Sequence, residues 1–209
     1  MAPPDPLQDR DDPTLARLAA VGDRAALDVL LGRHVDRVHA ICRRILGNPD
    51  DALDATQEAL IAVSRSIARF DERAAFTTWL YRVATNAALD ELRRRNRRPT
   101  PAETLAEPAP SGSGSDPERA ADRLDIDAAL TRTPEDFRVA VVLRDLCDLD
   151  YAQIAEILDV PPGTVRSRIA RGRAALAVEL GPTHDHPADD PAPGNQPGGP
   201  ERPTEHLHE

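Results

Sequence analysis

The sequence contains no lysine, so all 26 of its cationic side chains are arginine, and only 3% of its residues are aromatic. Its two cysteines, Cys42 and Cys147, lie far apart and outside any CxxC spacing, which argues against a zinc site and fits a reducing cytosol. No stretch approaches the roughly 20 apolar residues of a membrane-spanning helix. The acidic, proline-rich N-terminus is unlike a signal peptide. We therefore expect a cytoplasmic protein.

Motifs of the common enzyme classes are also missing. The chain has no glycine-rich phosphate loop, no GxSxG and no HExxH. His34 and His39 are five residues apart on a long predicted helix, so they do not share a metal-binding face, and the histidines near the C-terminus lie in a Pro/Gly-rich tail. We therefore predict a protein that is not an enzyme, with no catalytic residues, no metal ligands and no cofactor.

The formal charge of −10 is unevenly distributed along the chain. Acidic residues outnumber arginines by four to one in residues 1–13, by three to none in 99–117 and by six to one in 181–209. These segments are also rich in proline, glycine or serine, a composition typical of disorder. We predict an N-terminal disordered segment (1–13), a flexible acidic linker (99–117) and a disordered acidic tail (181–209). The remainder forms two blocks, block one (14–98) and block two (118–180), which together carry almost no net charge.

Both blocks show helical periodicity without strand-like alternation, which predicts an all-α fold of two helical domains. In block one, apolar residues at three and four spacing predict a long helix over 25–46 that ends at Gly47. Asn48 and Pro49 then have the pattern of a helix N-terminus. The expected helices are 15–22, 25–46, 49–69 and 77–97 in block one, and 118–131, 135–146, 151–158 and 162–178 in block two.

The last two helices of block two have the spacing of a helix-turn-helix, and Asp150 with Gln153 forms a capping box at its start. On the final helix, Val165 and Ile169 mark a buried stripe, small residues lie opposite, and arginines flank them. A narrow, small-residue ridge between long cations suits the DNA major groove. The alternative is a basic helix face that only contacts solvent. A stand-alone helix-turn-helix regulator would show the same features.

Two further features in block one suggest binding surfaces. The run Arg93–Arg98 ends the fourth predicted helix, where it could track a DNA backbone or simply complement the helix dipole. Four of the six aromatic residues fall within residues 70–81, either as core or as stacking surfaces for unpaired bases.

The predicted helix 49–69 has an unusual outer face. Leu53, Leu60, Val63 and Ile67 are expected to form its buried side. The opposite side carries carboxylates and an apolar residue, namely Asp51, Asp54, Gln57, Glu58, Ile61 and Arg65. An isoleucine among carboxylates suggests docking to a basic protein partner, and an ordinary solvated face explains the pattern equally well.

Three stretches carry a resemblance to a known family. DALDATQEALIAVSR (51–65) is similar to the polymerase-binding motif of extracytoplasmic-function (ECF) sigma factors, the bacterial initiation subunits of RNA polymerase. FDERAAFTTWLYRVATNAALDELRRRNRR (70–98) resembles their −10 region, and residues 132–176 resemble their −35-binding domain. Together the stretches cover most of both blocks. Within the family, the chain most resembles actinobacterial members of the sigma M type.

The resemblance implies a function and assigns roles by position. The protein would bind RNA polymerase core at the β′ clamp helices and near the β flap, recognise promoter DNA, and be held by an anti-sigma factor. The polymerase-binding residues would be Asp51, Asp54, Gln57, Glu58, Ile61 and Arg65. The −10 residues would be Phe70, Phe76, Trp79, Asn86, Arg93, Arg94 and Arg97. The −35 residues would be Thr164, Arg166, Ser167, Arg168, Ala170, Arg171 and Arg173.

Overall fold

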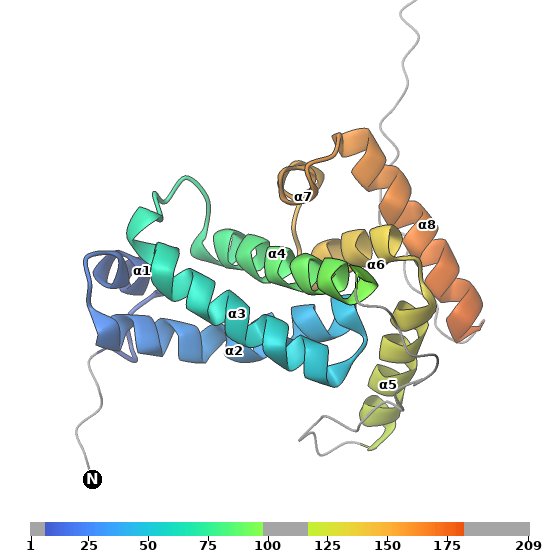
Figure 1. Ribbon diagram of the computed structural model, residues 1–209, viewed down its shortest axis with the longest axis horizontal. Coiled ribbons are helices and arrows are strands. Elements are labelled where there is room, and N and C mark those ends of the chain that lie inside the picture. The colour runs from blue at the N-terminus through green and yellow to red at the C-terminus, as the bar shows by residue number, and fades with distance from the viewer. Residues whose placement is uncertain (1–6, 98–116, 182–209) are drawn as a thin grey trace, which may run out of the picture.

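The computed structural model describes residues 7–97 and 117–181, with backbone alone for 117–124. The described residues form helices joined by short loops and contain no strand, as the sequence predicts (Figure 1). Block one consists of α1 (Asp12–Ala20), α2 (Arg24–Leu46), α3 (Pro49–Ser66), the short 3₁₀ helix η1 (Ile67–Arg69) and α4 (Phe76–Arg97). Block two consists of α5 (Pro117–Arg132), α6 (Glu135–Val141), the π-helical turn η2 (Val142–Leu146), α7 (Tyr151–Leu158) and α8 (Pro162–Leu180).

Block one is a bundle in which α2, α3 and α4 pack on one another and α1 covers one end of α2. The predicted helix boundaries between α2 and α3 are confirmed. Gly47 closes α2 in the left-handed conformation, with φ at 74°, and the side chain of Asn48 accepts hydrogen bonds from the backbone N–H groups of Asp50 and Asp51. Buried leucines and isoleucines of α2 fill the centre of the bundle.

The folded block starts earlier than the sequence suggested. We expected disorder over residues 1–13, whereas Leu7 packs partly buried against the core and α1 begins at Asp12. The cause is local, because the Asp11 side chain accepts a hydrogen bond from the backbone N–H of Thr14 at 3.0 Å and so caps the helix. Residues 1–6, and the predicted linker and tail over 98–116 and 182–209, lie outside the described residues.

Block two ends in the predicted helix-turn-helix formed by α7 and α8. The capping box is present, since Gln153 N–H donates to the Asp150 carboxylate and the Gln153 side chain accepts from Asp150 N–H. Asp159 ends α7 in the left-handed conformation, with φ at 52°, and α8 follows from Pro162. α8 then packs along α6.

The two blocks pack against each other in this structure. α2 contacts α5 and η2, and the first turns of α4 contact α7. Arg44 Nε lies 3.2 Å from an oxygen of Asp127, and Arg37 donates to the carbonyl of Leu146. Their apolar cores form a single cluster of buried residues.

Both cysteines are buried and unpaired with each other. Burial raises the pKa of the Cys42 thiol to about 11 and that of the Cys147 thiol to about 12. The guanidinium groups of Arg37 and Arg44 act on Cys147 in the opposite direction with a smaller effect. The thiols therefore behave as apolar core groups at neutral pH.

Candidate nucleic-acid interface

The exposed side of α8 is a continuous ridge of small and cationic residues. Seven residues of this helix were predicted to contact the −35 element, and five of them lie on this exposed side or at its edge. Arg166, Ser167, Ala170 and Arg171 are exposed, and Thr164 is half-buried, with its carbonyl accepting from the Ser167 hydroxyl at 2.9 Å. Val165 and Ile169 are buried on the opposite side, as predicted.

Two of the predicted DNA-contacting arginines are turned towards the protein instead. Arg168 lies 2.8 Å from a carboxylate oxygen of Asp136 on α6, and Arg173 lies 2.7 Å from one of Asp145 on η2. Both arginines are only partly exposed. We expected four arginines to flank the ridge equally; in this structure two of them hold α8 on its support and two remain on the outer surface.

The two outer arginines rest on aromatic rings. The guanidinium carbon of Arg166 lies 5.8 Å from the centre of the Tyr151 ring, and that of Arg171 lies 5.8 Å from the centre of the Phe137 ring. Both distances are within the range of cation–π attraction. Each ring restricts its arginine, which lowers the entropy that the side chain loses when it binds a base or a phosphate. Sequence periodicity did not identify Tyr151 or Phe137 because both lie on other helices.

Gly172 explains how α8 approaches α6 so closely. It is buried, and a Cβ atom at this position would lie 2.5 Å from Val141 Cγ2 and 2.9 Å from the carbonyl oxygen of Phe137. Real side chains do not tolerate such contacts, so the helix pair depends on the absence of a side chain here. The close approach also brings Arg171 over Phe137.

The aromatic residues of block one form one cluster at the start of α4. Phe70 and Phe76 meet edge to face, with ring centres 5.9 Å apart, and Trp79 lies 5.4 Å from Phe70 and 5.8 Å from Phe76. Phe76 is buried, while Phe70 and Trp79 are half-buried. Residues 71–75 form an exposed loop between the two phenylalanines. The cluster is therefore both core and base of a loop, so the two alternatives left by the sequence are compatible.

The surface of α4 beyond this cluster carries Arg82 and Asn86, one turn apart. Asn86 is exposed, as the predicted role requires. Arg82 Nη2 lies 3.0 Å from a carboxylate oxygen of Glu156 on α7, and Gln153 donates to the Thr78 hydroxyl at 3.3 Å nearby. Sequence reasoning missed Arg82, although the helical spacing of Trp79, Arg82 and Asn86 was a signal that could have found it.

The described part of the basic run at the end of α4 is exposed, and most of it is paired. Arg93 lies 2.8 Å from Asp90 and Arg94 lies 3.0 Å from Glu91, each three residues apart on the same helix. Arg97 donates to the Arg93 carbonyl near the helix end. The exposed pair of Arg93 with Asp90 contributes only about 0–1 kcal/mol, so a DNA phosphate can replace that carboxylate at little cost. The Glu91 side chain is only 7% exposed, so loss of Arg94 would leave a buried carboxylate without its partner at a greater cost.

The outer face of α3 carries an exposed patch that mixes carboxylates with apolar groups. Asp54, Gln57, Glu58 and Arg65 are exposed, and Ile61 among them is 42% exposed. We refer to Leu53, Asp54, Gln57, Glu58 and Ile61 as the α3 patch.

The expected position of Leu53 was wrong. The sequence placed it on the buried side of α3, but it is 52% exposed and belongs to the α3 patch. The buried side consists mainly of small residues instead, namely Ala52, Ala55, Thr56, Ala59 and Val63. Small side chains let α3 approach α2 and α4 closely, which turns the larger Leu53 outwards.

Asp51 differs from the other carboxylates of α3. It is half-buried, and its Oδ2 lies 3.5 Å from Arg95 Nη1 on α4. It therefore joins α3 to the basic end of α4 rather than standing free in the α3 patch.

The described residues offer no group of three or more His, Cys, Asp or Glu side chains that could bind a metal. His39 Nδ1 lies 3.2 Å from the Thr56 hydroxyl, and His34 contacts Asp12. Among the described helices, none is both long and apolar enough to cross a membrane.

Each of the two blocks matches a model of a known protein family. Residues 30–98 match Sigma-70 region 2, and residues 123–176 match Sigma-70 region 4. The ECF RNA polymerase sigma factor SigE of Mycolicibacterium smegmatis is 43% identical over 176 residues, which cover 79% of this chain and 67% of that protein. SigM of Mycobacterium tuberculosis, another ECF sigma factor, is 38% identical over 174 residues, which cover 83% of this chain and 86% of that protein.

The chain belongs to the family of ECF sigma factors. A solved structure of CnrH in complex with the cytosolic domain of CnrY matches with a TM-score of 0.59 and 25% identity, covering 81% of this chain and 96% of that one. Membership in the family favours a transcription initiation factor over a stand-alone helix-turn-helix regulator. In this sigma factor, α2–α4 thus form region 2 and α5–α8 form region 4.

Proposed function

We propose that this ECF sigma factor binds RNA polymerase core through the α3 patch and Arg65, reads the −35 element as duplex DNA through α8, and holds the −10 element as single strand. The observation that carries the proposal is the α3 patch, because a helix-turn-helix regulator acting alone has no use for exposed carboxylates mixed with Leu53 and Ile61. Apolar groups surrounded by charges of one sign are suited to a cationic protein partner. The partner proposed here is the β′ clamp helices, with the β flap near region 4.

The −35 contact is proposed to use the outer ridge of α8. Arg166 rests on the Tyr151 ring of α7 and Arg171 on the Phe137 ring of α6, and both arginines are exposed, so they are placed to reach base edges or phosphates. Ser167 and Ala170 allow close approach between them. Arg168 and Arg173 act here as supports through their pairs with Asp136 and Asp145, and a phosphate contact would require that they leave these carboxylates.

The −10 contact is proposed to use the loop 71–75, its aromatic base and the outer side of α4. Bases flipped out of the −10 element would lie between the loop and Asn86, with Phe70 and Trp79 as half-buried stacking surfaces. Arg93, Arg94 and Arg97 would follow the adjacent backbone. Arg82 extends this surface once its pair with Glu156 opens.

Each block alone is expected to bind DNA weakly, which gives a physical reason for using both blocks together. The folded blocks are nearly neutral overall, and several of the arginines on the proposed DNA surfaces, such as Arg93 and Arg94, already have carboxylate partners. Docking on polymerase would fix the spacing of the two blocks, so that the second contact forms at a high effective concentration. The acidic residues Glu103, Glu107 and Asp116 of the linker lie outside the described residues, and we propose that they follow the polymerase cleft.

We also propose a cytoplasmic site of action and an anti-sigma factor as an inhibitory partner. The structure of CnrH with the cytosolic domain of CnrY supports such a partner by analogy. A sigma M type is proposed for the subgroup, with the identity to SigM of Mycobacterium tuberculosis in its favour and the higher identity to SigE against it. No catalytic role is proposed.

The test of polymerase binding is the charge reversal Asp54→Arg in the α3 patch. We expect this variant to lose co-elution with polymerase core, while the matched reversal Asp28→Arg, at an exposed carboxylate of α2, leaves it intact. Circular dichroism spectra and unfolding midpoints serve as the control for folding, and both variants are expected to match the wild type. Retention of Asp54→Arg on core enzyme would rule out docking through α3. A gel shift without core enzyme separates the alternative function, because a stand-alone regulator binds duplex DNA by itself.

A further inference from the structure

The loop 71–75 is exposed along its length and yet is tied to the rest of region 2 from one side. Arg17 of α1 lies 3.3 Å from a carboxylate oxygen of Glu72 in the loop. The loop ends at Phe76, whose ring packs against the ring of His34 on α2 with 5.7 Å between ring centres. The loop is therefore joined to α1 by an exposed ion pair and to α2 by the packing of Phe76 at its end.

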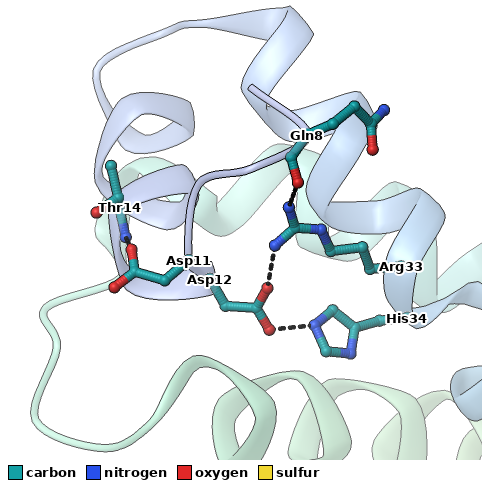
Figure 2. A network of polar contacts seen from close by, with 6 residues as sticks. All are labelled: Gln8, Asp11, Asp12, Thr14, Arg33 and His34. Carbon is teal, nitrogen blue, oxygen red and sulfur yellow. Dashed lines mark hydrogen bonds and ion pairs between the residues drawn. The ribbon is translucent and has the colours of Figure 1, made fainter. Parts of the chain in front are cut away.

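His34 is itself fixed by the N-terminal segment (Figure 2). Its Nε2 lies 2.6 Å from one carboxylate oxygen of Asp12, and the second oxygen accepts a hydrogen bond from Arg33 Nη1 at 2.9 Å. Arg33 Nη2 donates in addition to the backbone carbonyl of Gln8. One carboxylate thus joins two consecutive side chains of α2 and ties them to the start of α1.

The geometry determines what His34 must do. Because the Asp12 carboxylate only accepts hydrogen bonds when ionised, His34 Nε2 carries the proton and donates. The His34 side chain is only 14% exposed, so it has little water to replace a lost partner. Without the Asp12 carboxylate, no hydrogen bond to that side chain would hold the His34 ring in the orientation in which it packs against Phe76.

We infer that Asp12 is a positioning residue for −10 recognition: it orients His34, His34 supports Phe76, and Phe76 anchors the loop 71–75 and its aromatic base. This inference rests on the proposed function of that loop. Asp12 and His34 do not touch DNA in this scheme. They act through Phe76 on the surface that receives the single strand, and the contacts of Asp12 and His34 described above do not include a residue of the α8 ridge or of the α3 patch.

The test uses the full chain assembled with polymerase core, with Asp12→Asn as the variant and Asp9→Asn as the matched control at an exposed neighbouring position. One probe is a fork-junction fragment with a single-stranded −10 segment, taken from a promoter recovered by run-off transcription on a random library. The other is a −35 duplex fragment without a −10 element. We expect Asp12→Asn to weaken the fork-junction complex by roughly 5- to 20-fold and to change −35 binding less than about twofold.

Tryptophan fluorescence of the free protein, without polymerase, tests the same contacts from Asp12 through His34 to Phe76. Trp79 is the protein's single tryptophan and lies 5.8 Å from Phe76, so its emission reports the packing of the aromatic cluster. We expect a shift of the emission maximum in Asp12→Asn and in His34→Ala, with no further shift in the double variant, because both act through the same ring. Asp9→Asn is expected to keep the wild-type spectrum.

Several results would overturn the inference. Equal weakening on both probes would show that Asp12 only stabilises the fold, and unfolding midpoints of the same samples would show the same loss. Identical behaviour of Asp12→Asn and Asp9→Asn, or additive shifts in the double variant, would also contradict it. Failure of the wild-type protein to bind core enzyme or the fork-junction probe would instead refute the proposed function, so the two failures are distinguishable.

Discussion

The substitution Gly172→Ala tests whether α8 is positioned by direct contact with α6. A new Cβ atom would lie 2.5 Å from Val141 Cγ2, 2.9 Å from the Phe137 carbonyl oxygen and 3.3 Å from the Phe137 carbonyl carbon. The valine methyl can rotate away, but the carbonyl belongs to the backbone of α6 and cannot. The two helices must therefore separate, and overpacking of this kind costs about 1–3 kcal/mol.

A second glycine supplies the matched control. Gly32 lies inside α2, and a Cβ atom there would meet nothing within 4 Å. Gly32→Ala should therefore stabilise the protein by the helix propensity of alanine over glycine, about 0.8–1.0 kcal/mol. The same gain applies to Gly172→Ala, so it cancels in the comparison of the two variants. Their difference in free energy of unfolding is the contact cost alone, about 1–3 kcal/mol.

The assay is thermal unfolding of both variants beside the wild type. For a folded chain of this size, 1 kcal/mol corresponds to roughly 2–4 °C in the unfolding midpoint. We expect the midpoint of Gly32→Ala to rise and that of Gly172→Ala to lie below it by at least roughly 2 °C. Because Phe137 also supports Arg171, Gly172→Ala should weaken binding to a −35 duplex as well. Equal stabilisation by the two substitutions would refute the close-packing argument.

Two further predictions concern the buried thiols and the DNA-facing arginines. Unfolded thiols ionise near pH 9.0, whereas burial raises the pKa of Cys42 to about 11 and that of Cys147 to about 12. The unfolded state therefore releases protons first, and the stabilisation present below pH 9.0 is lost as the pH rises towards the folded values, by up to about 1.4 kcal/mol per pH unit for each thiol. Urea titrations at pH 8 and pH 10 should show a smaller loss in Cys42→Ala/Cys147→Ala than in the wild type, and an equal loss would contradict the thiol assignment. For the arginines, Arg171→Ala should cost about 1–3 kcal/mol at one −35 position, and Phe137→Leu should give a weaker loss at the same position. A uniform loss across promoter variants, measured by competition binding, would mean that Arg171 contacts only phosphate.

Local chemistry made much of the fold predictable. Asn48 with Pro49, Gly47, and the pair Asp150 and Gln153 each define a helix end through hydrogen bonds within a few residues, and the structure contains all of them. The all-α class and the helix-turn-helix followed from the same signals. The start of α1 was placed too late because the acidic composition of residues 1–13 concealed the cap formed by Asp11.

Tertiary contacts account for what the sequence could not predict. Leu53 has the same helical spacing as Leu60 and Ile67, so periodicity placed it inside, but the core side of α3 is decided by the alanines that allow close packing. The arginines of α8 looked equivalent on a helical wheel, and only the positions of Asp136 and Asp145 on neighbouring elements separate Arg168 and Arg173 from Arg166. Arg82 and Asp12 depend on partners that are distant in sequence.

The arginine–carboxylate pairs suggest how a DNA-binding protein with a net negative charge can bind its target. Many of the described arginines on the proposed DNA surfaces already lie against a carboxylate of the same molecule, and for Arg82 that carboxylate comes from the other block. A phosphate that replaces an exposed carboxylate gains little, because such pairs are worth only about 0–1 kcal/mol. Electrostatic attraction alone therefore gives weak binding at either surface. On the proposed function, specific binding would come from the simultaneous use of both surfaces, with polymerase holding the two blocks at the promoter spacing. In that scheme Arg82 would reach DNA only after it leaves Glu156.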